Sequence, residues 1–195
     1  MGKLTLVLGG ARSGKSTFAE QRALEIGGGP VLYVATAEAK DDEMRQRAGK
    51  HRRKRPVAWQ TLEAPQDVGA AIRQSSPDAR AILIDCLTVL VANRLVAATG
   101  KYEDPFDDPE HDPFDPAIEA EIVREVEAIA ACARDLPAEV IVVSNEVGMG
   151  VVPPYELGRA YRDALGRANQ VMARHADEVY LLVAGIPITV KGGSR

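Results

Sequence analysis

The chain has 195 residues, of which 46% are apolar and 27% are charged, and its formal net charge at pH 7 is -4. This balance is ordinary for a globular protein, so we predict a single domain over residues 1–195. The acidic total argues against nucleic acid as the main partner, because phosphate backbones favour basic surfaces. No apolar stretch is long enough to span a bilayer, and no signal peptide precedes the first strand pattern, so we expect a cytoplasmic protein.

Short apolar runs alternate with helical patterns along the chain. The strands that we predict are, in chain order, 4–8, 31–35, 81–84, 140–143 and 179–183, and residues 188–190 are a candidate partner for the last of these. A helix is expected from Gly14 to about Ile26, where three glycines and a proline follow. The strand runs are apolar throughout, as in strands covered on both faces. We therefore predict an α/β fold with a mostly parallel central sheet flanked by helices.

The segment Gly9-Gly10-Ala11-Arg12-Ser13-Gly14-Lys15-Ser16 matches the P-loop pattern, and it lies between the first predicted strand and the first predicted helix. Glycines let backbone N–H groups approach phosphate oxygens, and the start of a helix presents unpaired N–H groups. We expect Lys15 to reach the β- and γ-phosphates and Ser16 to offer its hydroxyl to Mg²⁺. The segment therefore predicts a site for a nucleoside triphosphate with Mg²⁺.

Asp85 follows the predicted strand 81–84. A Walker-B carboxylate at the end of such a strand lies near the metal of the P-loop, so we predict that Asp85 contacts Mg²⁺ or the nucleotide. The alternative interpretation is that Asp85 caps the helix that begins at Leu87.

A strongly basic segment spans residues 45–55, in which seven of the eleven residues are Lys or Arg. At helical spacing Arg47, His51 and Arg55 share one face. From the residues alone, three interpretations stay open: a solvated basic face, a nucleic-acid patch, and covalent catalysis. In the third, the surrounding cations keep His51 neutral and nucleophilic, and His51 attacks an α-phosphate.

Residues 101–116 contain four prolines and many acids, and Asp-Pro-Phe-Asp occurs in them twice. We predict an acidic, proline-rich surface loop; a second interpretation is that Phe106 and Phe114 anchor it on a neighbouring surface. The two cysteines, Cys86 and Cys132, are too few for a disulfide framework and are interpreted as buried small hydrophobic residues. His175 ends a long helical pattern and is given a structural role.

The order and spacing of these motifs resemble the bifunctional adenosylcobinamide kinase/adenosylcobinamide-phosphate guanylyltransferase family over nearly the whole chain. Besides the P-loop, the resemblance rests on YVATA at 33–37, DEM at 42–44, the spaced 47, 51 and 55, WQTLE at 59–63, IDCLT at 84–88, SNEVG at 144–148, VP at 152–153, NQ at 169–170 and GIP at 185–187. It implies a RecA-like P-loop core and two activities. One phosphorylates adenosylcobinamide with ATP or GTP, and the other transfers GMP from GTP to adenosylcobinamide phosphate, giving adenosylcobinamide-GDP.

The resemblance also implies roles for individual residues. The guanylylated histidine of the family falls on His51. Its nucleotide contacts fall on Gly9 through Ser16, on Ala35, Thr36 and Ala37, on Arg52, Arg53, Lys54 and Arg55, and on Glu63 and Asp85. Family members of this kind are homo-oligomers, typically trimers.

Two other functions are kept as alternatives. One is a single-function small-molecule kinase that uses only the P-loop. The other is a nucleotide-binding regulatory module, which is disfavoured because the chain lacks the Asn-Lys-x-Asp element by which regulatory GTPases read guanine.

Overall fold

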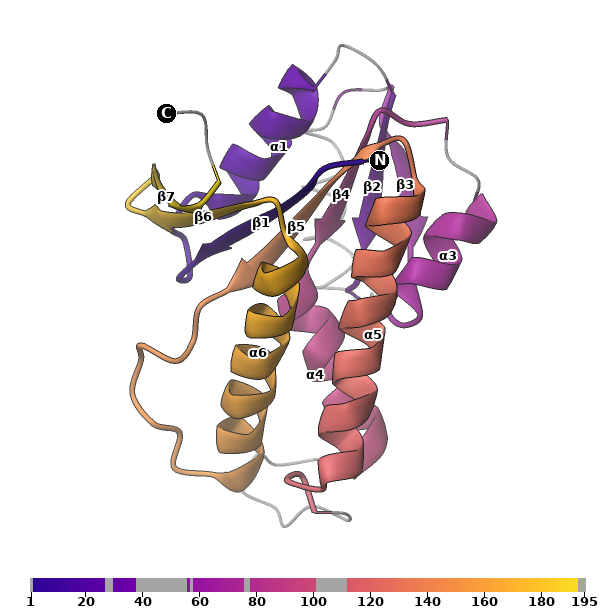
Figure 1. Ribbon diagram of the computed structural model, residues 1–195. Helices are drawn as coiled ribbons and strands as arrows, with labels where there is room; N and C mark the ends of the chain where they lie inside the picture. Colours follow the sequence, from indigo (N-terminus) through magenta and orange to yellow (C-terminus); the bar gives the residue numbers. More distant parts are fainter. Residues whose placement is uncertain are drawn as a thin grey trace.

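The computed structural model describes residues 2–26, 30–37, 56, 58–75, 78–100 and 112–192, and these ranges form a central sheet with helices on both faces (Figure 1). The strands are β1 (Leu4–Gly9), β2 (Val31–Ala35), β3 (Gln60–Glu63), β4 (Ala81–Asp85), β5 (Glu139–Asn145), β6 (Glu178–Val183) and β7 (Ile186–Lys191). The helices are α1 (Lys15–Glu25), α3 (Val68–Ser75), α4 (Leu87–Thr99), α5 (Pro116–Asp135) and α6 (Glu156–His175).

The seven strands are arranged in the order β3-β2-β4-β5-β1-β6-β7. All neighbours are parallel except β6 and β7, which form an antiparallel hairpin in which Tyr180 lies opposite Thr189. The predicted α/β fold with a mostly parallel sheet is confirmed, and so is the pairing of 179–183 with 188–190. The strand of the P-loop and the strand of Asp85 are separated by β5, which therefore lies in the middle of the site.

Successive residues of the central strands face opposite sides of the sheet, and each side has its own core. On one side Val7, Leu83 and Ile141 pack with α1, mainly through Ala19 and Ala23. On the other side the alternate strand residues pack under α3, α4, α5 and α6, which lie together on that face (Figure 1). Burial on both faces explains why these strands are mostly apolar between their ends.

The two outer strands differ from the sequence-based expectation. β3 was not predicted, because its residues Gln60–Glu63 are mostly polar and it lies at the edge of the sheet. β7, at the opposite edge, is exposed along its whole length rather than covered on both faces. An edge strand needs only one neighbour, so its sequence carries a weaker apolar signal.

The proline-rich stretch ends one residue earlier than predicted. Pro116 is the first residue of α5, and Asp115 caps that helix by accepting a hydrogen bond from the N–H of Ala117 at 2.8 Å. Proline suits this position because the first helical N–H has no partner inside the helix. Phe114 is 46% exposed, and residues 101–111, including Phe106, lie outside the described residues.

Three smaller interpretations can be compared with the structure. Cys132 is buried, as predicted. Cys86 is only half-buried, because it lies between the last residue of β4 and the start of α4, where the chain leaves the sheet. His175 ends α6, as expected, and its Nδ1 is 3.3 Å from Nη1 of Arg134. Over the described ranges, no helix has the length and apolar character that crossing a bilayer requires.

Candidate nucleotide-binding site

Five parallel strands end at one edge of the sheet, here called the carboxyl edge, and their last residues are predicted site residues or their neighbours. Across this edge Glu63, Ala35, Asp85, Asn145 and Gly9 end β3, β2, β4, β5 and β1 in that order. Neighbouring strands are about 4.8 Å apart, so the strands of Glu63 and Gly9 are roughly 19 Å apart. Glu63 and the P-loop therefore contact different parts of any one ligand.

The P-loop is held by backbone contacts that only glycine permits at two positions. Gly14 has a φ of 92°, and a Cβ there would lie 3.1 Å from the Cα of Gly185. A Cβ on Gly9 would lie 2.4 Å from Oγ of Ser13 and 2.9 Å from the carbonyl oxygen of Leu182. The N–H of Gly185 donates to the carbonyl of Ser13 at 2.8 Å. The turn between β6 and β7 thus fixes the shape of the loop.

Several polar groups of the P-loop have no complete set of partners within the described residues. Oγ of Ser13 is buried and makes no hydrogen bond with any described residue. Nζ of Lys15 donates to the carbonyl of Gly10 at 3.2 Å and so lies across the loop. Because α1 begins at Lys15, the N–H groups of its first turn also have few helical partners. A buried hydroxyl, a cation and free N–H groups around one loop fit the phosphates of a nucleotide.

The carboxylate of Asp85 is oriented by a neighbouring strand. The hydroxyl of Tyr33 donates to Oδ2 of Asp85 at 2.8 Å. The residue at the start of α4 is Cys86, and within the described residues no side-chain hydrogen bond caps that helix, so the interpretation of Asp85 as a cap is wrong. Burial and the charge of Asp85 raise the pKa of the Cys86 thiol, while the charge of Lys15 opposes them. Lys15 of the P-loop and Asp85 therefore both lie close enough to Cys86 for their charges to affect its thiol.

Thr36 ties the end of β2 to the end of β4. Its side chain is fully buried, and its hydroxyl donates to the carbonyl of Cys86 and accepts from the N–H of Cys86, both at 2.8 Å. Nδ2 of Asn93 donates to the carbonyls of Thr36 at 2.8 Å and of Pro65 at 3.0 Å. The predicted contact segment 35–37 is thus fixed between Asp85 and the turn that follows Glu63. Glu63 and Ala37 themselves are exposed.

The polar residues at the end of β5 were assigned no role from the sequence. Oγ of Ser144 donates to Oδ1 of Asn169 at 2.7 Å, and Nδ2 of Asn169 donates to the carbonyl of Asn145 at 3.0 Å. The N–H of Asn145 donates to Oγ1 of Thr88 at 2.7 Å. This closed set of contacts, here called the β5 network, lies between the strands of the P-loop and Asp85. In the sequence its residues appear only as members of the motifs at 84–88, 144–148 and 169–170, which do not show that they contact one another.

The donors at the carboxyl edge suit Mg²⁺. Within the described residues, no three His, Cys, Asp or Glu side chains gather into a protein-only metal site. Mg²⁺ rarely uses such a cage; it keeps several waters and takes one or two protein oxygens together with phosphate oxygens. The hydroxyl of Ser16, in the first turn of α1, and the carboxylate of Asp85 match that smaller set.

The basic part of the predicted site cannot be placed. His51, Arg52, Arg53, Lys54 and Arg55 lie outside the described residues, as does Arg47, and their roles stay predictions. Of the P-loop residues, Ala11 and Arg12 are exposed, whereas Ser13 is buried.

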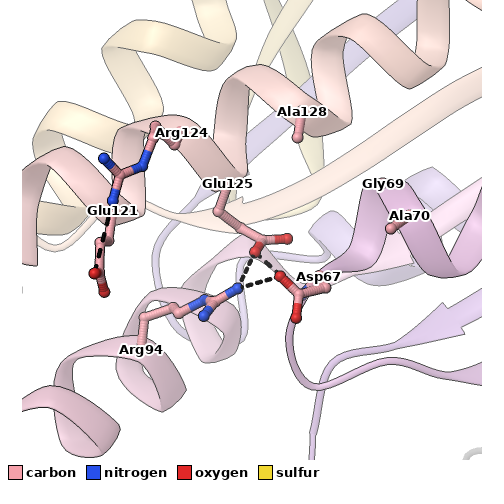
Figure 2. A pocket seen from close by; sticks show the side chains of 8 residues that line it. All are labelled: Asp67, Gly69, Ala70, Arg94, Glu121, Arg124, Glu125 and Ala128. Carbon is pink, nitrogen blue, oxygen red and sulfur yellow. Dashed lines mark hydrogen bonds and ion pairs between the residues drawn. The ribbon is translucent and has the colours of Figure 1, made fainter.

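A cavity of about 380 Å³ lies between α3, α4 and α5, and none of its lining residues belongs to the P-loop (Figure 2). Its charged side chains are paired: Arg94 contacts both Asp67 and Glu125, and Arg124 contacts Glu121. Burial alone would lower the pKa of Arg94, but the hydrogen bonds and charges of Glu125 and Asp67 outweigh it and raise that pKa. The pairs of Arg94 join α4 to α5 and to the residue that precedes α3, so we interpret the cluster as structural.

The chain is similar to known proteins over almost its whole length. Residues 5–190 match the family described as cobinamide kinase / cobinamide phosphate guanyltransferase. The "Bifunctional adenosylcobalamin biosynthesis protein CobP" of Pseudomonas aeruginosa is 42% identical over 187 residues, which cover 96% of each chain. Proteins called "Bifunctional adenosylcobalamin biosynthesis protein CobU" from Salmonella typhimurium and Escherichia coli are 43% and 44% identical, over 96% of this chain and 99% of theirs.

Proposed function

Since the chain belongs to the cobinamide kinase / cobinamide phosphate guanyltransferase family, we propose that residues 9–16 bind the triphosphate of ATP or GTP for both of its activities. The protein is a bifunctional adenosylcobinamide kinase and guanylyltransferase of cobalamin biosynthesis. The observation that carries the site is the buried hydroxyl of Ser13, which has no hydrogen-bond partner among the described residues and lies inside a glycine loop crossed by Lys15. Gly9, Gly10, Ala11, Arg12, Ser13, Gly14, Lys15 and Ser16 make up this phosphate site.

Ser16 and Asp85 are the residues that we propose to hold Mg²⁺. When bound, the ion offsets negative charge on the phosphates. Tyr33 donates a hydrogen bond to one carboxylate oxygen of Asp85 and thereby fixes the direction of the other. Such outer contacts orient the ligands of a metal.

In the kinase step a hydroxyl of adenosylcobinamide attacks the γ-phosphorus of ATP or GTP. The bond from the γ-phosphorus to the bridging oxygen breaks, the nucleoside diphosphate leaves, and the hydroxyl proton is released. Lys15 is catalytic in this step, because its ammonium group stabilises the charge that develops on the phosphate oxygens. The protein contributes mainly positioning and charge.

In the transferase step His51 is the proposed nucleophile. An imidazole nitrogen of His51 attacks the α-phosphorus of GTP, a P–N bond forms, and pyrophosphate leaves. A phosphate oxygen of adenosylcobinamide phosphate then attacks the same phosphorus, the P–N bond breaks, and adenosylcobinamide-GDP is released. Two displacements replace one direct meeting of two anionic substrates.

The remaining predicted contacts are assigned to the same nucleotide. Ala35, Thr36 and Ala37 line it at the end of β2, and Glu63 accepts hydrogen bonds from the guanine or ribose. Arg52, Arg53, Lys54 and Arg55 supply positive charge to the phosphates. Three strands lie between the strand of Glu63 and the strand of the P-loop, and this separation supports a nucleotide that lies along the carboxyl edge.

We further propose one domain over residues 1–195, a homotrimer, and a place in the cytoplasm. The apolar side chains of β7 support an interface between copies: Ile186, Ile188 and Val190 are 67%, 49% and 63% exposed at the edge of the sheet. Exposed apolar patches of this kind commonly mark protein contacts. Adenosylcobinamide and its phosphate are the partner substrates, and we assign neither nucleic acid nor a membrane as a partner.

The test of the covalent step is a labelling experiment. The protein is incubated with α-labelled GTP and Mg²⁺, and acid-labile label on the protein is measured. We expect label on the wild type and on His175→Ala, a control for the loss of a histidine at the end of α6. We expect none on His51→Ala, and none on the wild type from γ-labelled GTP.

The outcomes separate the proposed function from its alternatives. Equal label on His51→Ala and the wild type contradicts the assignment of His51. Phosphorylation of adenosylcobinamide without any label or pyrophosphate release favours a single-function kinase. GTP binding without either reaction favours a regulatory module.

A further inference from the structure

Asn145 occupies a central position at the carboxyl edge. It ends β5, the strand between the P-loop strand β1 and the Asp85 strand β4. In the register of β1 and β5 it lies beside Gly9, the first residue of the P-loop. The N–H of the next residue, Glu146, donates to the carbonyl of Gly9 at 3.1 Å. The main chain at Asn145 is therefore joined directly to the phosphate loop.

The β5 network fixes the main chain of Asn145 from the opposite side. Its N–H donates to Thr88 and its carbonyl accepts from Asn169. Thr88 and Asn169 are only 7% and 6% exposed. Ser144, which is fully buried, completes the network through Asn169, and the hydroxyl of Tyr161 donates to the carbonyl of Thr88 at 3.3 Å. Burial of so many polar groups is unfavourable unless they are paired, and here they pair around one residue.

The side chain of Asn145 is the exception in this arrangement. Its Oδ1 is buried, and among the described residues no donor lies within hydrogen-bond distance of it. The amide groups of the two other asparagines near this edge are engaged: Asn169 bonds to Ser144 and Asn145, and Asn93 bonds to Thr36 and Pro65. A buried oxygen without a donor is rare in folded proteins, so its partner is expected to arrive with a ligand.

We propose that Asn145 contacts the γ-phosphate end of the nucleotide, where its Oδ1 accepts a hydrogen bond from an O–H group beside that phosphate. This inference rests on the proposed function of the P-loop. Two O–H groups fit the description: a water bound to the Mg²⁺ of the nucleotide, and the acceptor hydroxyl of adenosylcobinamide. If the donor is the metal-bound water, Asn145 lets the site distinguish a triphosphate that is ready for transfer from a diphosphate product. If the donor is the acceptor hydroxyl, Asn145 positions that hydroxyl for the transfer.

The experiment measures the affinities of Asn145→Ala for a non-hydrolysable ATP analogue and for ADP, both with Mg²⁺, together with its melting temperature and its kinase kcat. We expect an unchanged melting temperature, because the side-chain oxygen bonds nothing within the described residues of the free protein. If the donor is the metal-bound water, the preference for the triphosphate analogue over ADP falls about tenfold. If the donor is the acceptor hydroxyl, that preference is kept and the kinase kcat falls about tenfold.

Two further variants distinguish a ligand contact from a structural role. Asn145→Asp keeps an acceptor oxygen but places a negative charge beside the phosphate, so it is expected to weaken triphosphate binding more than Asn145→Ala does. Asn93→Ala removes an amide that bonds two carbonyls, so its melting temperature should fall while its triphosphate preference is kept.

The inference is overturned if Asn145→Ala keeps both the triphosphate preference and kcat. It is also overturned if the variant melts earlier and binds both nucleotides equally more weakly. A wild type that neither binds the analogue nor transfers phosphate contradicts the proposed function itself, whereas a normal wild type with a normal Asn145→Ala contradicts this inference alone.

Discussion

The buried polar groups that the structure describes are of two kinds, those with hydrogen-bond partners inside the chain and those without. Where they hold helices and strands together, the carboxylates are fully engaged: Glu125 accepts from the N–H groups of Asp67 and Val68 and from Arg94. At the carboxyl edge, the buried oxygens of Ser13 and Asn145 have no partner within the described residues. Groups that maintain the fold find partners inside the chain, and groups without them mark the place where a ligand is expected.

A second carboxylate strengthens the contrast. Glu178 is 7% exposed and pairs with Lys3 at 2.8 Å and Arg22 at 3.0 Å. Within the part of the chain that the structure describes, the Nε atoms of Arg22 and Arg94 lack partners, but each guanidinium contacts its carboxylate through a terminal nitrogen. Each of these arginines therefore has a carboxylate partner even though its Nε–H makes no hydrogen bond within the described residues, and this distinguishes the two clusters from the P-loop.

The largest effect is expected at the structural cluster around Glu125. Glu125→Ala removes the acceptor for two N–H groups at the start of α3 and leaves Asp67 as the one carboxylate that pairs with Arg94 among the described residues, so the free energy of unfolding should fall by about 3–5 kcal/mol. Urea denaturation measures this change. The control is Glu121→Ala, whose exposed pair with Arg124 is worth about 0.5 kcal/mol. A loss below about 1 kcal/mol for Glu125→Ala would contradict the structural assignment.

The next effect concerns activity at the carboxyl edge. Lys15→Met removes the cation over the P-loop, and we expect kinase kcat to fall by roughly 10²–10³-fold with little change in melting temperature. Kinase turnover with saturating ATP measures this effect. In the matched variant Lys191→Met, the lost amine bonds the carbonyls of Ala173 and Arg174 at the end of α6, so stability should fall slightly and turnover should not. Equal turnover for the two variants would rule out a catalytic role for Lys15.

Much of the fold could be predicted from the sequence because the central strands are covered on both faces. Leu6 and Val7 pack into the cores on opposite faces of the sheet, so their strand is apolar except for Thr5 and its final glycine, and the pattern is easily seen. The edge strand Gln60–Glu63 escaped prediction for the opposite reason: it has few buried neighbours, and its residues are those of a loop. The half-burial of Cys86 was missed because an apolar run does not reveal where the strand leaves the core.

The candidate site was predictable where chemistry depends on local sequence. The P-loop and Asp85 follow strands directly, so their residue order suffices to place them at one edge. The β5 network was not predictable, because Thr88, Ser144 and Asn169 come from three separate elements and meet only through tertiary packing. No local pattern encodes contacts across such distances along the chain.

A smaller effect concerns pH and the ion pairs of Glu178. Burial alone would raise the pKa of Glu178, but the hydrogen bond and charge of Lys3, with the charge of Arg22, outweigh it and lower that pKa. A lowered pKa in the folded state means that the stabilisation is present above the ordinary glutamate pKa and is lost as pH falls through the folded value. We expect Glu178→Gln to lower the free energy of unfolding by about 2 kcal/mol at pH 7. Denaturation at several pH values should show the difference shrinking in acid; a constant difference would contradict this account.

The smallest effect is expected at Ser13, whose buried hydroxyl has no partner within the described residues and can be compared with the hydroxyl of Ser75, an exposed serine that bonds inside the chain. Ser13→Ala removes a hydroxyl that has no partner within the described residues, so the melting temperature of the free protein should not fall. Its affinity for ATP with Mg²⁺ should fall about fivefold, because one hydrogen bond to phosphate is lost. Ser75→Ala should behave in the opposite way, since the hydroxyl of Ser75 donates to the carbonyl of Ile72 at 2.8 Å. Calorimetry and nucleotide titration of both variants measure this, and a destabilised Ser13→Ala that binds ATP normally would show that its hydroxyl belongs to the fold.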